Sequence, residues 1–127
     1  MATWVQVREI LLGITSFNFE LESENVVSVR IPTEGGRDQR VYVCNEGDSV
    51  CVISAICKLE AIDLNKLFAA PFMRDFPFGF GVMTDHLAIR HLQLLESLDV
   101  PEVTKPIIRV AHLADSLERK LIEDDIY

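Results

Sequence analysis

The segment SVCVISAIC, residues 49–57, constrains the fold more than any other part of the sequence. It has the length of a β-strand, and almost every position carries an apolar side chain. Successive side chains of a strand point to opposite faces of a sheet, so a strand without a polar face needs cover on both sides. We therefore expect 49–57 to lie at the centre of a sheet with a helix over one face. A partner subunit is the alternative cover for the other face.

Segments with a period of two predict the neighbours of this strand. In 17–23 and 27–31, apolar side chains alternate with polar ones, which is typical of strands with one solvent-facing side. RVYVC at 40–44 predicts a further strand, and 45–48 reads as the turn that follows it. A later hairpin is expected within 79–91. The sequence thus predicts three or four strands before a short middle helix and two strands after it.

Helical periodicity predicts three helices. Thr3 has the spacing of a capping box before the first helix, whose apolar residues are Trp4, Val7, Ile10 and Leu11. Asp63 is expected to cap a short helix that ends before Pro71. Thr104 is expected to cap the long last helix. Its apolar stripe consists of Ile107, Val110, Ala111, Ala114, Leu117 and Leu121. We expect the acidic end, 123–125, to fray.

Composition excludes several classes of function. The 127 residues fit one domain, 1–127, with a core of its own. A net charge of −8 without clustered lysine or arginine argues against nucleic acid and anionic membranes as partners. The first residues lack the pattern of a signal peptide, and no segment approaches the length of a membrane span. Together with the three cysteines, which we expect to be reduced, this favours a cytoplasmic protein.

The cysteines and histidines form no recognised catalytic or metal-binding pattern. The spacing of Cys44, Cys51 and Cys57 matches no zinc motif, and each lies in an apolar run, so we expect reduced, small hydrophobic side chains. FGFGVMTDHLAIRH at 78–91 resembles an active site at first, but it lacks a phosphate-binding fingerprint. We interpret it as a hairpin in which His86 and His91 point to different sides. We expect no catalytic residue, metal or cofactor.

The segment PFMRDFPFGF at 71–80 has the most unusual local composition in the chain. Its two prolines rule out a continuous helix or a central strand. One interpretation is that its aromatic rings plug the end of the core beneath a loop. The other is an apolar surface for a partner, since rigid aromatic residues dominate binding hot spots. The residues predicted to contact a partner are Phe72, Met73, Phe76 and Phe78.

The order of elements, the hairpin FGVMTDHLAIRHLQLL and the terminal helix in VTKPIIRVAHLADSLERKL resemble the bacterial type III secretion chaperone-like superfamily. This superfamily includes the YbjN-type proteins and the class I secretion chaperones of the CesT/Tir group. The resemblance covers nearly the whole chain and rests on the pattern of elements. It implies an α+β domain with a twisted antiparallel sheet of about five to six strands and helices largely on one face. It also implies homodimerisation and a non-enzymatic role.

These observations favour a protein-binding module, chaperone-like or a regulatory adaptor, that binds a segment of a partner protein through apolar surface. A small-ligand or metal sensor is the alternative. A small enzyme using a cysteine or histidine is a third hypothesis, which would require a nucleophile, a base and an orienting group in one pocket.

Overall fold

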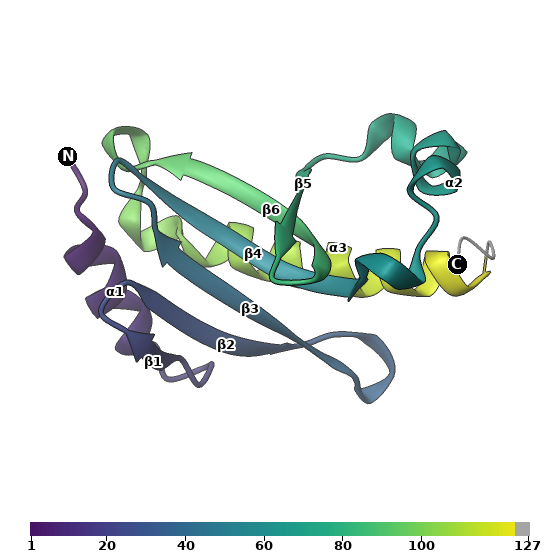
Figure 1. Cartoon of the computed structure of the whole chain (residues 1–127). Helices are drawn as coiled ribbons and strands as arrows, with labels where there is room; N and C mark the ends of the chain where they lie inside the picture. The colour runs from purple at the N-terminus through teal and green to yellow at the C-terminus, as the bar shows by residue number, and fades with distance from the viewer. Residues whose placement is uncertain (124–127) are drawn as a thin grey trace.

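The computed structural model describes residues 1–123 and shows an α+β fold with one six-stranded antiparallel sheet (Figure 1). The strand order is β1-β2-β3-β4-β6-β5, so β4 lies within the sheet as expected. The strands are β1 (Glu20–Ser23), β2 (Val26–Pro32), β3 (Asp38–Asn45), β4 (Ser49–Lys58), β5 (Gly79–Met83) and β6 (His86–Leu94). The predicted α+β class and strand number are confirmed. The expectation that the acidic end frays falls at Asp124 and Asp125 outside the described residues.

Three α-helices accompany the sheet: α1 (Trp4–Leu12), α2 (Leu64–Ala69) and α3 (Thr104–Glu123). The predicted capping box is present, because the Thr3 hydroxyl accepts a hydrogen bond from the Gln6 backbone N–H and the Gln6 side chain accepts one from the Thr3 backbone N–H. Asp63 caps α2 by accepting from the backbone N–H groups of Asn65 and Lys66. Thr104 is the first residue of α3 and not its cap, so that prediction was one residue too late.

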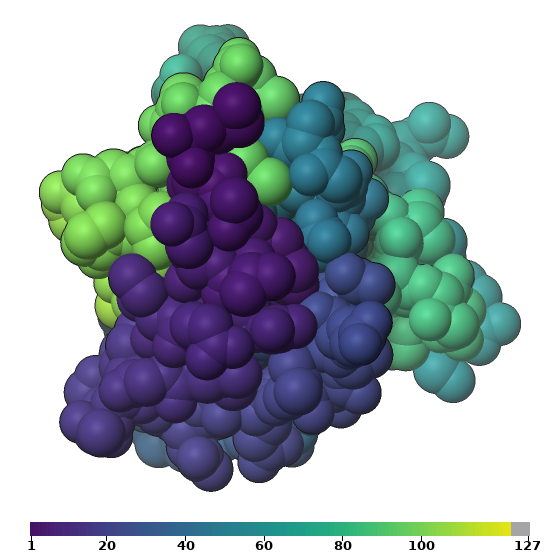
Figure 2. All heavy atoms as spheres, turned by 90° about the vertical axis from the view of Figure 1, so that its left-hand side faces the viewer, coloured from purple at the N-terminus to yellow at the C-terminus, as the bar shows by residue number. Residues whose placement is uncertain are grey.

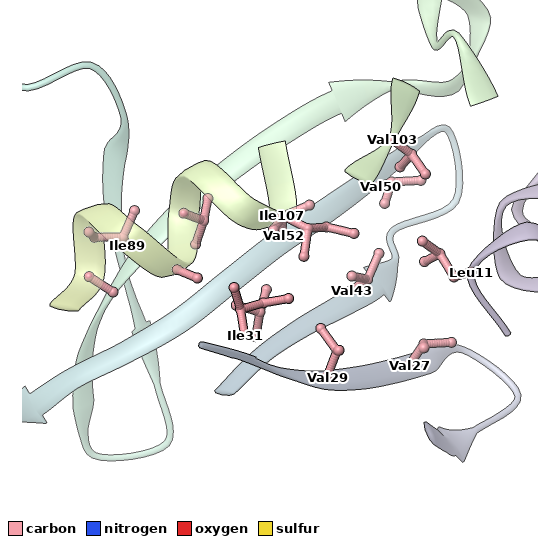
Figure 3. Packing of buried hydrophobic residues seen from close by; sticks show 14 of the residues in the cluster. Leu11, Val27, Val29, Ile31, Val43, Val50, Val52, Ile89, Val103 and Ile107 are labelled. Atoms are coloured by element: carbon pink, nitrogen blue, oxygen red, sulfur yellow. The ribbon is translucent and has the colours of Figure 1, made fainter. Parts of the chain in front are cut away.

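Helix α3 runs along the sheet and covers one of its faces (Figure 1). Its apolar stripe packs against the alternate residues of the central strands that point toward it (Figure 3). Val50 and Val52 of β4 lie beside Ile107 in this core, and all three side chains are almost fully buried. Each such side chain contributes about 1.5–3 kcal/mol through the hydrophobic effect. The expectation that a helix covers one face of the strand at 49–57 is confirmed.

The other face of β4 carries no helix within the described residues. There Cys51 and Ile53 are buried mainly among side chains of neighbouring strands, in a small cluster with Ala88. The exposed fractions of Leu92 and Leu94, at the end of β6, are 50% and 47%. We call this side of the sheet the open face.

Helix α1 lies across one end of the molecule, beside the 45–49 turn and the segment that leads into α3 (Figure 2). The Trp4 indole N–H donates to the Glu24 backbone oxygen at 2.8 Å, which ties the helix to the β1–β2 turn. Trp4, Val7 and Leu11 are buried, but Ile10 is 41% exposed. The buried stripe of this short helix is therefore narrower than its apolar pattern, which includes Ile10.

The first strand is much shorter than the predicted 17–23. Of the segment 17–23, only the four residues of β1 form a strand, which pairs with β2. All four are exposed, and a register irregularity lies between Leu21 and Ser23. Phe17 and Phe19 precede the strand and pack edge to face, with ring centroids 6.4 Å apart. The two rings pack against each other and against the core, and this part of the chain does not pair with β2. The alternating pattern of 17–23 therefore overestimated the length of the strand.

The predicted hairpin is present as β5 and β6, joined by the two-residue turn Thr84–Asp85. The absence of a side chain at Gly81 leaves room for the Arg90 side chain, which a Cβ at this position would approach to 3.1 Å. Thr84 has a φ of 58°, a left-handed conformation that is strained for a β-branched residue. His86 contacts Asp85 while His91 packs against Phe78, so the two histidines point to different sides as expected.

Candidate partner-binding surface

The phenylalanine-rich segment folds back along α3. Pro71 starts a short 3₁₀ turn, Pro71–Asp75, and an extended stretch then leads into β5. Phe72 lies near Lys120, Phe76 beside Leu113 and Leu117, and Phe78 near Arg109. The segment therefore runs antiparallel to α3 along about 16 Å of the helix, given a rise of about 1.5 Å per residue.

The predicted residues Phe72, Met73, Phe76 and Phe78 are all half-buried, and each packs against the main core. Phe76 stacks on Phe80 at 5.1 Å between ring centroids. The rings thus cover the end of the core, as the first interpretation expects. They also present part of their surface to solvent, as the second interpretation, a partner-binding surface, requires. Whether they bind a partner stays a prediction. Phe68, which was not among the residues predicted to contact a partner, is the most exposed aromatic ring nearby, at 56%.

Two cations lie over these rings. The Arg109 guanidinium carbon is 5.7 Å from the centre of the Phe78 ring, and the Lys120 ammonium nitrogen is 5.7 Å from the centre of the Phe72 ring. Contacts of this kind contribute about 0.5–1 kcal/mol at exposed sites. In a chain with a net charge of −8, they place positive charge and aromatic surface side by side.

Two hollows flank the exposed side of α3. The first, of about 200 Å³, lies between the helix and Phe72, Phe76 and Pro77. The second, of about 310 Å³, lies toward the 33–37 loop and is lined by Glu34 and Arg119. Leu113 and Ser116 line both hollows and separate them. We call this side of the helix the α3 ridge; it consists of Arg109, His112, Leu113, Ser116 and Lys120.

A partly buried ion pair fixes the wall of the second hollow. Arg37 Nε and Nη2 donate to the two carboxylate oxygens of Asp115 at 2.9 and 3.1 Å, and the Asp115 side chain is only 3% exposed. The hydrogen bond from Arg37 lowers the pKa of Asp115. Arg119 lies 3.6 Å from Asp115 and 3.3 Å from Glu34. The network therefore anchors the 33–37 loop, with Gly35 and Gly36 at positive φ, to α3.

No pattern in the sequence predicted this network. Asp115 was assigned to neither the apolar nor the polar side of the last helix. The only local signal is its i, i+4 spacing to Arg119, which is typical of a helical ion pair. Its main partner, Arg37, is 78 residues away in the sequence, and no pattern in the chain connects the two.

The cysteines lie away from the α3 ridge and show no sign of activation. All three are free, as expected. Burial and the neighbouring Cys51 and Glu46 raise the pKa of Cys44 to about 11, and burial also raises the pKa values of Cys51 and Cys57. A cysteine that reacts rapidly as a nucleophile at neutral pH requires the opposite shift. Within residues 1–123, no group of three or more histidine, cysteine or acidic side chains is arranged to hold a metal ion.

A wider cleft of about 650 Å³ crosses the open face between β3 and the β5–β6 turn. Arg30 and Arg40 lie directly opposite each other there, but Asp38 pairs with Arg30 at 3.0 Å and Glu22 with Arg40 at 3.6 Å. His86 Nδ1 lies 2.7 Å from Asp85, and this contact lowers the pKa of Asp85. The cleft is broad and its charges are paired, unlike the enclosed apolar pockets that bind small molecules.

Comparisons with protein-family models, with curated proteins and with solved structures find no match to this chain. The resemblance to the secretion chaperone-like superfamily therefore stays a prediction that rests on the order of elements. Among residues 1–123, no helix combines the length and apolar character that crossing a membrane requires.

Proposed function

We propose that this chain is a non-enzymatic protein-binding module, chaperone-like or a regulatory adaptor, which holds an amphipathic segment of a partner protein on the α3 ridge. The observation that carries the proposal is the row of half-exposed rings along the helix, Phe72, Phe76 and Phe78, with Lys120 and Arg109 over the outer two.

The chemistry of the ridge specifies the segment that would fit. Apolar side chains would enter the first hollow, where Phe72, Phe76 and Leu117 present aromatic and aliphatic surface. Polar side chains of the segment would lie over the second hollow, whose lining is mainly charged. Carboxylates on the same segment would meet Arg109 and Lys120, which form no ion pair within the described residues. Aromatic and arginine side chains are enriched among the residues that dominate the binding energy of protein interfaces.

Affinity capture from cells of the source organism, with the parent chain and with a variant at Phe76, tests this function. Phe76→Asp places a charge in the first hollow, so we expect the variant to lose a partner that the parent chain recovers. Circular dichroism and urea unfolding show whether the variant is folded, and only a folded variant that loses the partner supports the binding surface. If the variant is unfolded, Phe76 is a plug of the core, and the binding surface must be sought elsewhere.

We also propose that the chain forms a homodimer, as the resemblance implies, and that it acts in the cytoplasm. The chain mass is 14.4 kDa, and light scattering during gel filtration measures the mass in solution directly. We expect twice the chain mass at micromolar concentration. The mass of a single chain under the same conditions would contradict the dimer and leave the binding proposal intact.

A further inference from the structure

Two of the three cysteines lie directly opposite each other on neighbouring strands. Cys44 of β3 and Cys51 of β4 are register partners. The Glu46 N–H donates to the Ser49 oxygen at 2.9 Å and closes the turn between the strands. Hydrogen-bonded and non-hydrogen-bonded pairs alternate along an antiparallel ladder, and Cys44 and Cys51 lie two positions from the pair Glu46 and Ser49. They therefore form a hydrogen-bonded pair, for which Cα atoms are about 5.5 Å apart. Disulfides usually span about 4.4–6.8 Å between Cα atoms.

Both thiols point to the open face of the sheet. Cys51 belongs to the small cluster with Ile53 and Ala88, and Cys44 packs against that cluster. Cys51 is 3% exposed and Cys44 is half-buried, so a small reagent from solvent would meet Cys44 first. The Arg90 guanidinium interacts with the Cys51 thiol and favours its thiolate form.

The third cysteine lies on the opposite side of the sheet. Cys57 pairs with Leu87 and packs against the main core under α3, near Glu118. A register irregularity between Ala55 and Cys57 shifts it to that side. Within one folded chain, therefore, Cys44 and Cys51 are the pair that can join, and Cys57 is a matched control of similar burial.

We propose that Cys44 and Cys51 are a site of reversible disulfide formation on the open face, oxidised by exchange with a low-molecular-weight disulfide. The Cys44 thiolate attacks one sulfur of the reagent, forms a mixed disulfide and releases one reagent thiol. The Cys51 thiolate then attacks the Cys44 sulfur, forms the Cys44–Cys51 bond and releases the second thiol. The chain loses two electrons and two protons, and the reagent is reduced to two thiols.

The disulfide would alter the open face without disturbing the α3 ridge. It would join β3 to β4 beside the 45–49 turn and remove the thiol that Arg90 contacts. The exchange is slow at neutral pH, because burial keeps the Cys44 thiol protonated. Since the thiolate is the nucleophile, the initial rate should rise about tenfold per pH unit between pH 7 and pH 9.

Incubation of the reduced, folded protein with glutathione disulfide tests the site. We expect a mass decrease of two hydrogens without attached glutathione, in the parent and in Cys57→Ser alike. A protease that cuts after glutamate separates the two cysteines at Glu46, so the digest of Cys57→Ser should contain cross-linked peptides. In Cys51→Ser the reaction should stop with glutathione attached to Cys44.

Three results would overturn the proposal. They are stable glutathione adducts on Cys44 in the parent, cross-links that require Cys57, and no oxidation at any pH at which circular dichroism shows an intact fold. Repeating the reaction in urea provides the comparison, because an unfolded chain should give mixed pairings among all three cysteines. If urea and buffer give the same products, the native sheet does not direct the pairing.

Discussion

The partly buried ion pair between Arg37 and Asp115 provides a quantitative test of the structure. We predict that the isosteric change Asp115→Asn lowers the free energy of unfolding by about 2 kcal/mol at neutral pH. Asp115 accepts two hydrogen bonds from Arg37 and is 3% exposed, and hydrogen bonds to charged groups contribute about 1.5–3 kcal/mol. Arg37 is 43% exposed, so water resolvates it in the variant and keeps the cost below the roughly 3–5 kcal/mol of a fully buried pair.

The same pair predicts the pH dependence of the effect. The hydrogen bond from Arg37 lowers the pKa of Asp115 in the folded chain below its unfolded value of about 3.9. A group with a depressed folded pKa contributes stability above its unfolded pKa and loses it as the pH falls through the folded pKa. The difference between the parent and Asp115→Asn should therefore be full at pH 7 and should shrink progressively below about pH 4.

Urea unfolding followed by the fluorescence of the single tryptophan, Trp4, measures both quantities. Asp38→Asn is the matched control, because the Arg30–Asp38 pair has a similar distance, 3.0 Å, but side chains that are 60% and 49% exposed. Such a surface pair contributes less than about 1 kcal/mol. An Asp115→Asn penalty that is the same at pH 7 and pH 3, or no larger than that of Asp38→Asn, would refute the reasoning.

Two further changes test local features of the fold in the same assay. Thr84→Gly should raise the free energy of unfolding by about 1 kcal/mol, because glycine adopts a φ of 58° without the steric cost that threonine bears; a loss of stability would show that the turn is not strained. Thr3→Ala should lower it by about 1 kcal/mol through loss of the capping hydrogen bond to the Gln6 N–H, and an unchanged value would mean that α1 frays from its first turn.

The sequence predicted those parts of the fold that depend on neighbouring residues. The capping box at Thr3, the cap at Asp63 and the buried strand around 49–57 follow from local chemistry, and all three are present. The short β1 was not predictable in the same way. Its length depends on how a sheet edge pairs, and the alternating pattern at 17–23 carries no information about the edge.

The candidate site depends on contacts between distant segments. Composition singled out Phe72 and Phe76, but it did not show that they run antiparallel to α3 or that Lys120 lies over one of them. The wall of the second hollow depends on the pairing of Arg37 with Asp115, which only the fold brings together. The aromatic component was thus predictable from sequence, whereas the ridge as a surface was not.

The most direct test of the binding proposal is site-specific photo-cross-linking in cells of the source organism. A photoreactive amino acid at Ser116, between the two hollows, should give one dominant adduct with a partner protein, while the same amino acid at the exposed Ser16 should give none. A third position, Leu92, reports on the open face. An adduct at Ser116 alone is the result that we predict. Adducts of equal yield at all three positions, or an adduct at Leu92 without one at Ser116, would contradict the assignment of the partner to the α3 ridge.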